Sequence, residues 1–265
     1  HGVLEDITDG EYNTAIGQAS LQQLTTAEGN TSIGRASGAV LTTSSFNTLV
    51  GYSAGNAIAA GQTTTDGTTA VGYNALGAIT IGARNIAIGP QALQFSDTAT
   101  DNIAIGFNAL YDQDVGGSGH AADSDSNIAI GSHAMSGSWA DTKSEQNIAI
   151  GVSSMAGALN GAEYNIAVGN SSLTALISGD RNISIGFEAL LAADGAESDN
   201  IAIGYNAMAT ASVDTAIKNI AIGTYALDAT AANAQTGTIA IGHQALSALT
   251  SGAGNTAVGY QCLDA

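Results

Sequence analysis

Hydrophobic positions along this chain recur in a short alternating pattern and never form long runs. The segment "DNIAIGFNAL" (101–110) returns almost unchanged as "SDNIAIGYNAM" (198–208). In N-I-A-I-G, two β-branched residues alternate with a small one, which is the period-two pattern of a β-strand. The run is too short for an independent helix, and the glycine permits a tight corner. The pattern therefore predicts a very short strand that ends in a sharp turn, followed by a second short segment.

The pattern repeats fourteen times along the chain. Each copy ends its strand-like triplet on a glycine, and the commonest spacing between these glycines is 17 residues. The anchoring glycines are Gly17, Gly34, Gly51, Gly72, Gly89, Gly106, Gly131, Gly151, Gly169, Gly186, Gly204, Gly223, Gly242 and Gly259. One unit cannot bury its apolar face, but stacked units can. We therefore predict an all-β fold, a parallel β-solenoid of about fourteen coils, forming one elongated domain over 1–265 with repeats at about 11–263.

Stacking places equivalent residues of successive coils above one another. We expect the isoleucines to point inward as an apolar ladder, the asparagines to form a hydrogen-bonded row at one corner, and the glycines to make the opposite corner. In three central coils these residues are Ile88, Ile105 and Ile130; Asn85, Asn102 and Asn127; Gly89, Gly106 and Gly131. The small residue between the isoleucines is then expected to face outward as a smooth strip open to another surface. This strip comprises Ala87, Ala104, Ala129, Ala149, Ala167, Ala202, Ala221, Ala240 and Ala257.

Charge and composition narrow the classes of partner. The formal net charge is −18, which argues against binding to nucleic acid or to an anionic membrane surface. No apolar run approaches the length of a membrane helix, so we expect no membrane insertion in this segment. No nucleophile elbow, phosphate-binding glycine loop or zinc spacing is present, and Cys262 occupies a small-residue slot of the repeat. An enzyme is therefore not expected, and no cofactor is predicted.

Several non-repeated residues are candidates for contact with a partner. Six copies carry an aromatic residue just after the glycine, which either packs on another subunit or sugar, or covers the end of its own core. These residues are Tyr52, Tyr73, Phe107, Phe187, Tyr205 and Tyr260. The longer insertions 56–67, 111–126 and 136–146 are candidate contact loops, because solenoid insertions gather on one face and often bind partners. Trp139 lies in the third loop, either as an exposed anchor or as a locally packed side chain.

The insertion at 111–126 is also the one candidate site for a metal ion. It holds Asp112, Asp114, Asp123 and Asp125, and carboxylates two residues apart can chelate calcium. The calcium-loop order lacks its following glycine and later glutamate, so a solvated acidic loop is the preferred interpretation.

The repeats "NIAIGFNAL", "NTAVGYQCL" and "TTAVGYNAL" resemble the head repeats of trimeric autotransporter adhesins. They are also similar to the NTAVGYNAL-type repeats of some bacteriophage tail fibres. The resemblance covers nearly the whole chain. It implies a left-handed parallel β-roll, three chains assembled side by side, and attachment to a host surface.

These observations together predict a non-catalytic structural and adhesive fibre segment of an extracellular appendage or a virion. The expected partners are further copies of the chain, in a homotrimer or a filament, and a host-surface glycan or protein receptor. Two alternatives stay open. One is a purely structural filament or shaft subunit without its own receptor, and the other is a glycan-, calcium- or ice-binding solenoid.

Overall fold

The computed structural model describes residues 2–58, 66–78, 80, 82–95, 98–111, 124–139, 142–210, 216–229 and 236–264. These residues form fourteen three-residue strands joined by turns, and none of them is helical. The predicted fold class, an all-β parallel β-solenoid with one strand per repeat, is confirmed. The chain groups into two compact units, one of residues 1–133 with 139–141 and one of 134–138 with 142–265. Each unit is described by itself below.

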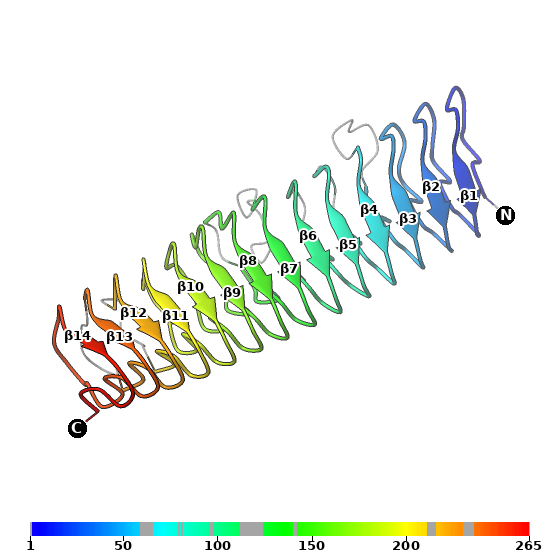
Figure 1. The fold of residues 1–265 in the computed structure, drawn as a ribbon. Coiled ribbons are helices and arrows are strands. Elements are labelled where there is room, and N and C mark those ends of the chain that lie inside the picture. Colours follow the sequence, from blue (N-terminus) through cyan, green and yellow to red (C-terminus); the bar gives the residue numbers. More distant parts are fainter. Residues whose placement is uncertain are drawn as a thin grey trace. The chain divides into compact units, whose positions relative to one another are not determined.

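The first unit contains seven parallel strands, and each pairs with the next one along the chain (Figure 1). They are β1 (Thr14–Ile16), β2 (Thr31–Ile33), β3 (Thr48–Val50), β4 (Thr69–Val71), β5 (Ile86–Ile88), β6 (Ile103–Ile105) and β7 (Ile128–Ile130). The pairing joins equivalent residues, so Ile103 faces Ile86 on one side and Ile128 on the other.

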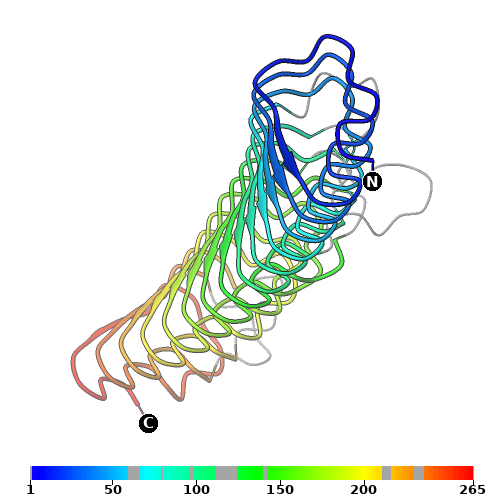
Figure 2. The same cartoon turned by 90° about the vertical axis from the view of Figure 1, so that its right-hand side faces the viewer.

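The second unit repeats this arrangement with seven more strands. They are β8 (Ile148–Ile150), β9 (Ile166–Val168), β10 (Ile183–Ile185), β11 (Ile201–Ile203), β12 (Ile220–Ile222), β13 (Ile239–Ile241) and β14 (Thr256–Val258). Within each unit, successive coils follow nearly the same outline (Figure 2). Insertions between repeats therefore leave the strand register unchanged.

A fixed series of left-handed backbone conformations closes each coil. The corner glycines have φ between +125° and +141°, and in Gly106 an added Cβ would lie 2.5 Å from the carbonyl oxygen of Gly131. Side chains other than glycine are therefore excluded there. The second and fourth residues after the glycine also have positive φ, for example Asn108 (+53°) and Leu110 (+48°). The segment after the corner is thus a series of turns, neither a strand nor a helical turn.

The orientation of the strands is the reverse of our prediction. The middle residue is buried in β2 to β14, with Ala104 and Ala129 at 0 % exposure, whereas Ile103 and Ile105 on either side of Ala104 are only partly buried. The expected inward isoleucine ladder and outward alanine strip are therefore wrong. The interior is filled from the opposite wall by leucines and methionines such as Leu110 and Met135, which are fully buried. A narrow coil has room for these long side chains only where the strand opposite them carries a small residue.

Leu49 of β3 is an exception that supports the same rule, namely that the strand residue and the residue opposite it share a fixed interior volume. It stands where other strands carry alanine or serine, and the two nearest coils carry Gly38 and Gly55 where leucine or methionine is usual. A Cβ added to either glycine would lie 2.8 Å from a methyl carbon of Leu49. The leucine thus fills from the strand side the space that two leucines fill elsewhere.

The asparagine row forms as predicted. The backbone N–H of Asn102 donates to Oδ1 of Asn85 at 2.9 Å, and that of Asn127 donates to Oδ1 of Asn102 at 2.8 Å. Nδ2 of Asn102 also donates to the carbonyl oxygen of Ser124 at 3.0 Å. All three asparagines are fully buried, so their hydrogen bonds are made away from water. The row therefore joins neighbouring coils at the start of every strand in which asparagine is present.

Candidate interaction surface

The outward side of the strands is an apolar surface that no described residue covers. The first and third residues of each strand point outward and make up what we call the isoleucine face. In the second unit it consists of Ile148, Ile150, Ile166, Val168, Ile183, Ile185, Ile201, Ile203, Ile220, Ile222, Ile239, Ile241, Thr256 and Val258. None of the fourteen described strands contains a charged residue. Ile185 remains 38 % exposed, although β9 and β11 flank its strand on both sides.

The size of this face can be estimated from strand geometry. Seven strands about 4.8 Å apart, each presenting two side chains about 6.6 Å apart, cover roughly 30 by 10 Å. The face of the second unit alone thus has a projected area of about 300 Å², which reaches the range of the largest apolar patch on an ordinary monomer. Burial of such a face stabilises an assembly in proportion to the apolar area that is removed from water. An exposed apolar patch of this size is often functional.

Threonine replaces the first isoleucine in β1 to β4 and in β14. Because these positions point outward, the threonines lie on the surface and make this part of the isoleucine face less apolar. The isoleucine face is therefore most apolar in β5 to β7 of the first unit and in β8 to β13 of the second.

The six predicted aromatic residues are all exposed, between 42 % for Phe187 and 73 % for Tyr260. Four of them stack in pairs across adjacent coils: the rings of Tyr52 and Tyr73 lie 5.7 Å apart at 22°, and those of Phe187 and Tyr205 lie 5.4 Å apart at 7°. Tyr260 stacks on His243, and Phe107 meets His133 edge-on. Stacking on a sugar requires a free ring face. Each of these stacks covers one face of each ring that takes part in it.

Charged pairs border the strands at their beginnings. Arg181 binds Asp199 through Nε–Oδ1 at 2.6 Å and Nη2–Oδ2 at 3.2 Å, and Arg84 binds Asp101 in the same bidentate manner. The hydrogen bonds from each guanidinium lower the pKa of Asp101 and of Asp199. Both pairs are exposed, so they contribute little to stability and mainly keep this border polar.

The other candidate residues divide into those that are described and those that are not. Trp139 is 1 % exposed, so the exposed-anchor interpretation is wrong and the locally packed one is correct. Asp125 accepts the backbone N–H of Thr100 at 2.7 Å, which gives it a structural role. The remaining calcium candidates, Asp112, Asp114 and Asp123, lie outside the described residues.

Sequence reasoning missed the isoleucine face because it placed these side chains in the core. The signal that could have revealed it was the shared exception at Leu49, Gly38 and Gly55, where one large residue replaces an alanine and two leucines become glycines. Because side-chain volume that is lost at one position is gained at the other, the middle strand residue and the leucine position fill the same interior space.

Neither a metal site nor a membrane helix is found in the described part of the chain. Its histidines, cysteine and acidic residues form no group of three that could hold a metal ion. The described residues include no helix long and apolar enough to cross a membrane. No family model, no curated protein and no solved structure matches the chain.

Proposed function

We propose that this chain is a non-catalytic structural and adhesive segment of an extracellular or virion fibre, in which copies pack side by side through their isoleucine faces. The uncovered isoleucine face is the observation that carries the proposal. Three copies arranged around a common axis, as the resemblance to adhesin heads implies, would each turn this face inward. The solenoid would then supply stiffness, and the insertions between repeats would supply attachment to a host-surface glycan or protein.

The energetics favour this use of the face. Full burial of an isoleucine side chain is worth about 1.5–3 kcal/mol, so a side chain that is 38 % exposed gains about 0.6–1 kcal/mol when a partner covers it. Many such side chains act together along each unit. A lysine at one position would lose this gain and would also bury a charge, which costs several kcal/mol more.

Two matched substitutions test the lateral assembly. Ile185 on the isoleucine face and Ile177 in a turn are 38 % and 39 % exposed. We expect Ile185→Lys to lower the mass of the wild-type assembly by at least half in analytical ultracentrifugation, and Ile177→Lys to leave it unchanged. Circular dichroism checks that both variants remain folded. A monomeric wild-type protein, or equal effects of the two substitutions, would contradict the proposal.

Adhesion requires a separate experiment, because a shaft without its own receptor would assemble equally well. Labelled protein is applied to a glycan array and to intact bacterial cells, together with a variant in which residues 112–123 are replaced by a short Gly-Ser linker. Saturable binding that the replacement removes supports the adhesive part. Assembly without saturable binding to either surface would leave a purely structural filament segment as the function.

A further inference from the structure

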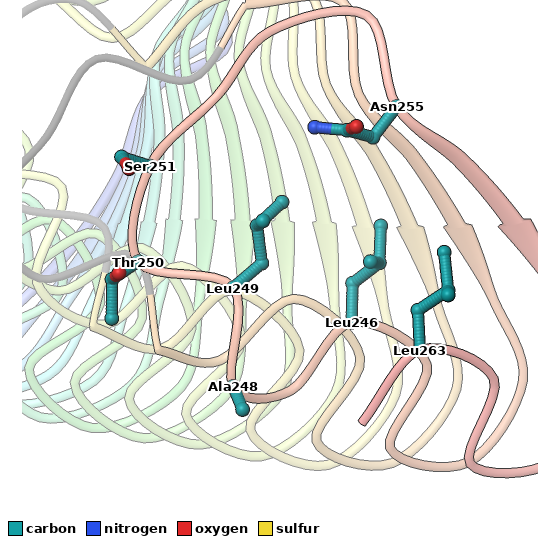
Figure 3. Close-up of a pocket in the computed structure, with 7 residues that line it drawn as sticks. All are labelled: Leu246, Ala248, Leu249, Thr250, Ser251, Asn255 and Leu263. Carbon is teal, nitrogen blue, oxygen red and sulfur yellow. The ribbon is translucent and has the colours of Figure 1, made fainter. Parts of the chain in front are cut away.

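The residue before the corner asparagine, or before the threonine that replaces it, lies on the outside of the coil. The asparagine itself turns inward, as Figure 3 shows for Asn255, whose side chain points toward Leu246 and Leu249. We call the preceding residues the corner row, and in the first unit they are Tyr12, Gly29, Phe46, Gly67, Arg84, Asp101 and Ser126. All seven have φ between +56° and +70°. The row therefore keeps one backbone conformation whichever residue occupies it.

Members of the corner row stack from one coil to the next. Gly67 donates its N–H to the carbonyl of Ser45, the residue before Phe46, at 3.2 Å. Arg84 donates in the same way to the carbonyl of Asp66, the residue before Gly67, at 3.2 Å. Phe46, Gly67 and Arg84 therefore occupy successive levels. Because neighbouring levels lie about 4.8 Å apart, roughly 10 Å separates Phe46 from Arg84, and the residue between them has no side chain.

The Phe46 ring is covered on one side and open on the other. A Cβ added to Gly29 would lie 2.9 Å from Cδ1 and 3.1 Å from Cε1 of Phe46, so the ring rests against Gly29. A Cβ added to Gly67 would approach Cγ of Arg84 at 3.9 Å and no ring atom within 4 Å. Phe46 is 61 % exposed and forms no ring contact with another described residue. The ring thus borders an unfilled place in the row, which we call the Gly67 gap.

Polar groups border the Gly67 gap on the side away from the ring. Arg84 donates to Asp101 through Nε and Nη2, so its Nη1 takes no part in that pair and can donate to a ligand. The hydrogen bond from Arg84 lowers the pKa of Asp101, which keeps the carboxylate charged and able to accept hydrogen bonds. Thr48 and Thr69, the first residues of β3 and β4, add outward hydroxyl groups. The gap is therefore lined by an apolar ring face, an ion pair with no net charge, and hydroxyls.

We propose that the Gly67 gap binds a hexopyranose unit of a neutral glycan, which stacks on Phe46 and exchanges hydrogen bonds with Arg84 and Asp101. A pyranose has an apolar face of C–H groups and a rim of hydroxyls, which matches this combination of groups. A sugar ring at the level of Gly67 lies about 5 Å from the level of Phe46, within the range of about 4.5–7 Å for stacked rings. The formal charge of −18 on the chain repels anionic sugars.

The second unit carries the same residue types without the gap. Tyr164 is a corner-row residue of 49 % exposure, and the next member of the row is Arg181, whose N–H donates to the carbonyl of Glu163 at 3.0 Å. No glycine separates the aromatic ring from the arginine there. The role of the Gly67 gap in attachment rests on the adhesive part of the proposed function, and the gap adds a glycan contact outside the insertions. Several copies in one assembly would present several such contacts at once.

Biolayer interferometry on surfaces coated with dextran, mannan, galactan or β-glucan tests the site, with dextran sulfate as the anionic comparison. The wild-type protein should bind at least one neutral polysaccharide saturably and should not bind dextran sulfate. Phe46→Ala removes the ring, and Gly67→Gln fills the gap. Gln146 occupies the same row with φ +57°, and the added Cβ meets nothing closer than 3.9 Å, so the fold accommodates Gly67→Gln. We expect each variant to weaken binding at least about tenfold, and the control Tyr164→Ala to change it less than about twofold.

The outcome is separable from that of the proposed function. Lateral assembly depends on Ile185 and is read from particle mass, whereas sugar binding is read from the coated surface. Binding that survives replacement of 112–123 but is lost in Gly67→Gln assigns attachment to the corner row and removes it from that insertion. Absence of binding to every neutral polysaccharide would overturn the inference and leave the lateral assembly intact. Binding that folded Gly67→Gln retains, or that Tyr164→Ala weakens as much as Phe46→Ala does, would overturn it as well.

Discussion

Replacing Leu49 with alanine should open a cavity inside the first unit. Leu49 is fully buried, and its two methyl carbons lie against Gly38 and Gly55, which have no side chains to fill the space. Large-to-small substitutions at buried leucines typically cost about 2–5 kcal/mol, and the upper part of that range applies where neighbours cannot collapse. The outward neighbour Val50 is only half-buried, so Val50→Ala should cost less than about 1 kcal/mol.

The same site allows a compensating substitution. Gly55→Leu alone should destabilise the coil by about 1–3 kcal/mol, because its Cβ would lie 2.8 Å from a Leu49 methyl carbon. Combined with Leu49→Ala and Gly38→Leu, it restores the alanine and leucine pattern of the other coils. Leucine at this position adopts φ near +50° elsewhere in the chain, close to the +59° of Gly55. The triple variant should therefore regain most of the stability lost by the single ones.

Chemical denaturation, with hydrogen exchange of the amides in residues 30–58, measures these differences locally. Local exchange is needed because solenoids unfold in parts and a single global transition is not assured. If Leu49→Ala costs no more than Val50→Ala, the middle strand residue does not face the interior. If the energies of the three substitutions simply add, the leucine does not fill the space of the two glycines.

Three further predictions concern other positions. Thr238 interrupts the asparagine row, and its buried Oγ1 has no partner among the described residues. Thr238→Asn should therefore raise the free energy of unfolding by about 1 kcal/mol in thermal denaturation, whereas Thr238→Ser should leave it unchanged. Burial raises the pKa of Asp228, so its contribution to stability is present at low pH and is lost as pH rises through the folded-state pKa. Asp228→Asn should therefore stabilise the protein at pH 7 and reduce this acid-range dependence in melting curves taken between pH 3 and 7. Gly106→Ala should lower the free energy of unfolding by more than about 2 kcal/mol in the same assay, because the added Cβ would meet the Gly131 carbonyl. The control Gly254→Ala places its Cβ against nothing within 4 Å and should lower the free energy of unfolding by about 1 kcal/mol.

The repeat pattern alone was enough to predict the solenoid, its fourteen strands and the asparagine row. Hydrogen bonding between successive coils needs the same backbone geometry at every level, and this requirement appears in the sequence as Asn before the strand and Gly after it. The positions of Asn102 and Gly106 could therefore be assigned from one sequence. The direction in which Ile103 and Ile105 point could not be assigned in the same way.

What the sequence by itself determined was the period, the strand positions and the residues at the two corners, because each follows from local backbone requirements that recur. What only the tertiary structure decided was which side of the strand faces inward. A three-residue strand presents alternate residues to opposite sides, and hydrophobicity favoured Ile105 for the interior over Ala104. The interior is instead chosen by volume, because Leu110 and its equivalents cross a narrow coil and leave space only for a small residue such as alanine or serine. The larger aliphatic side chains consequently lie outside, where they form the surface on which the proposed assembly depends.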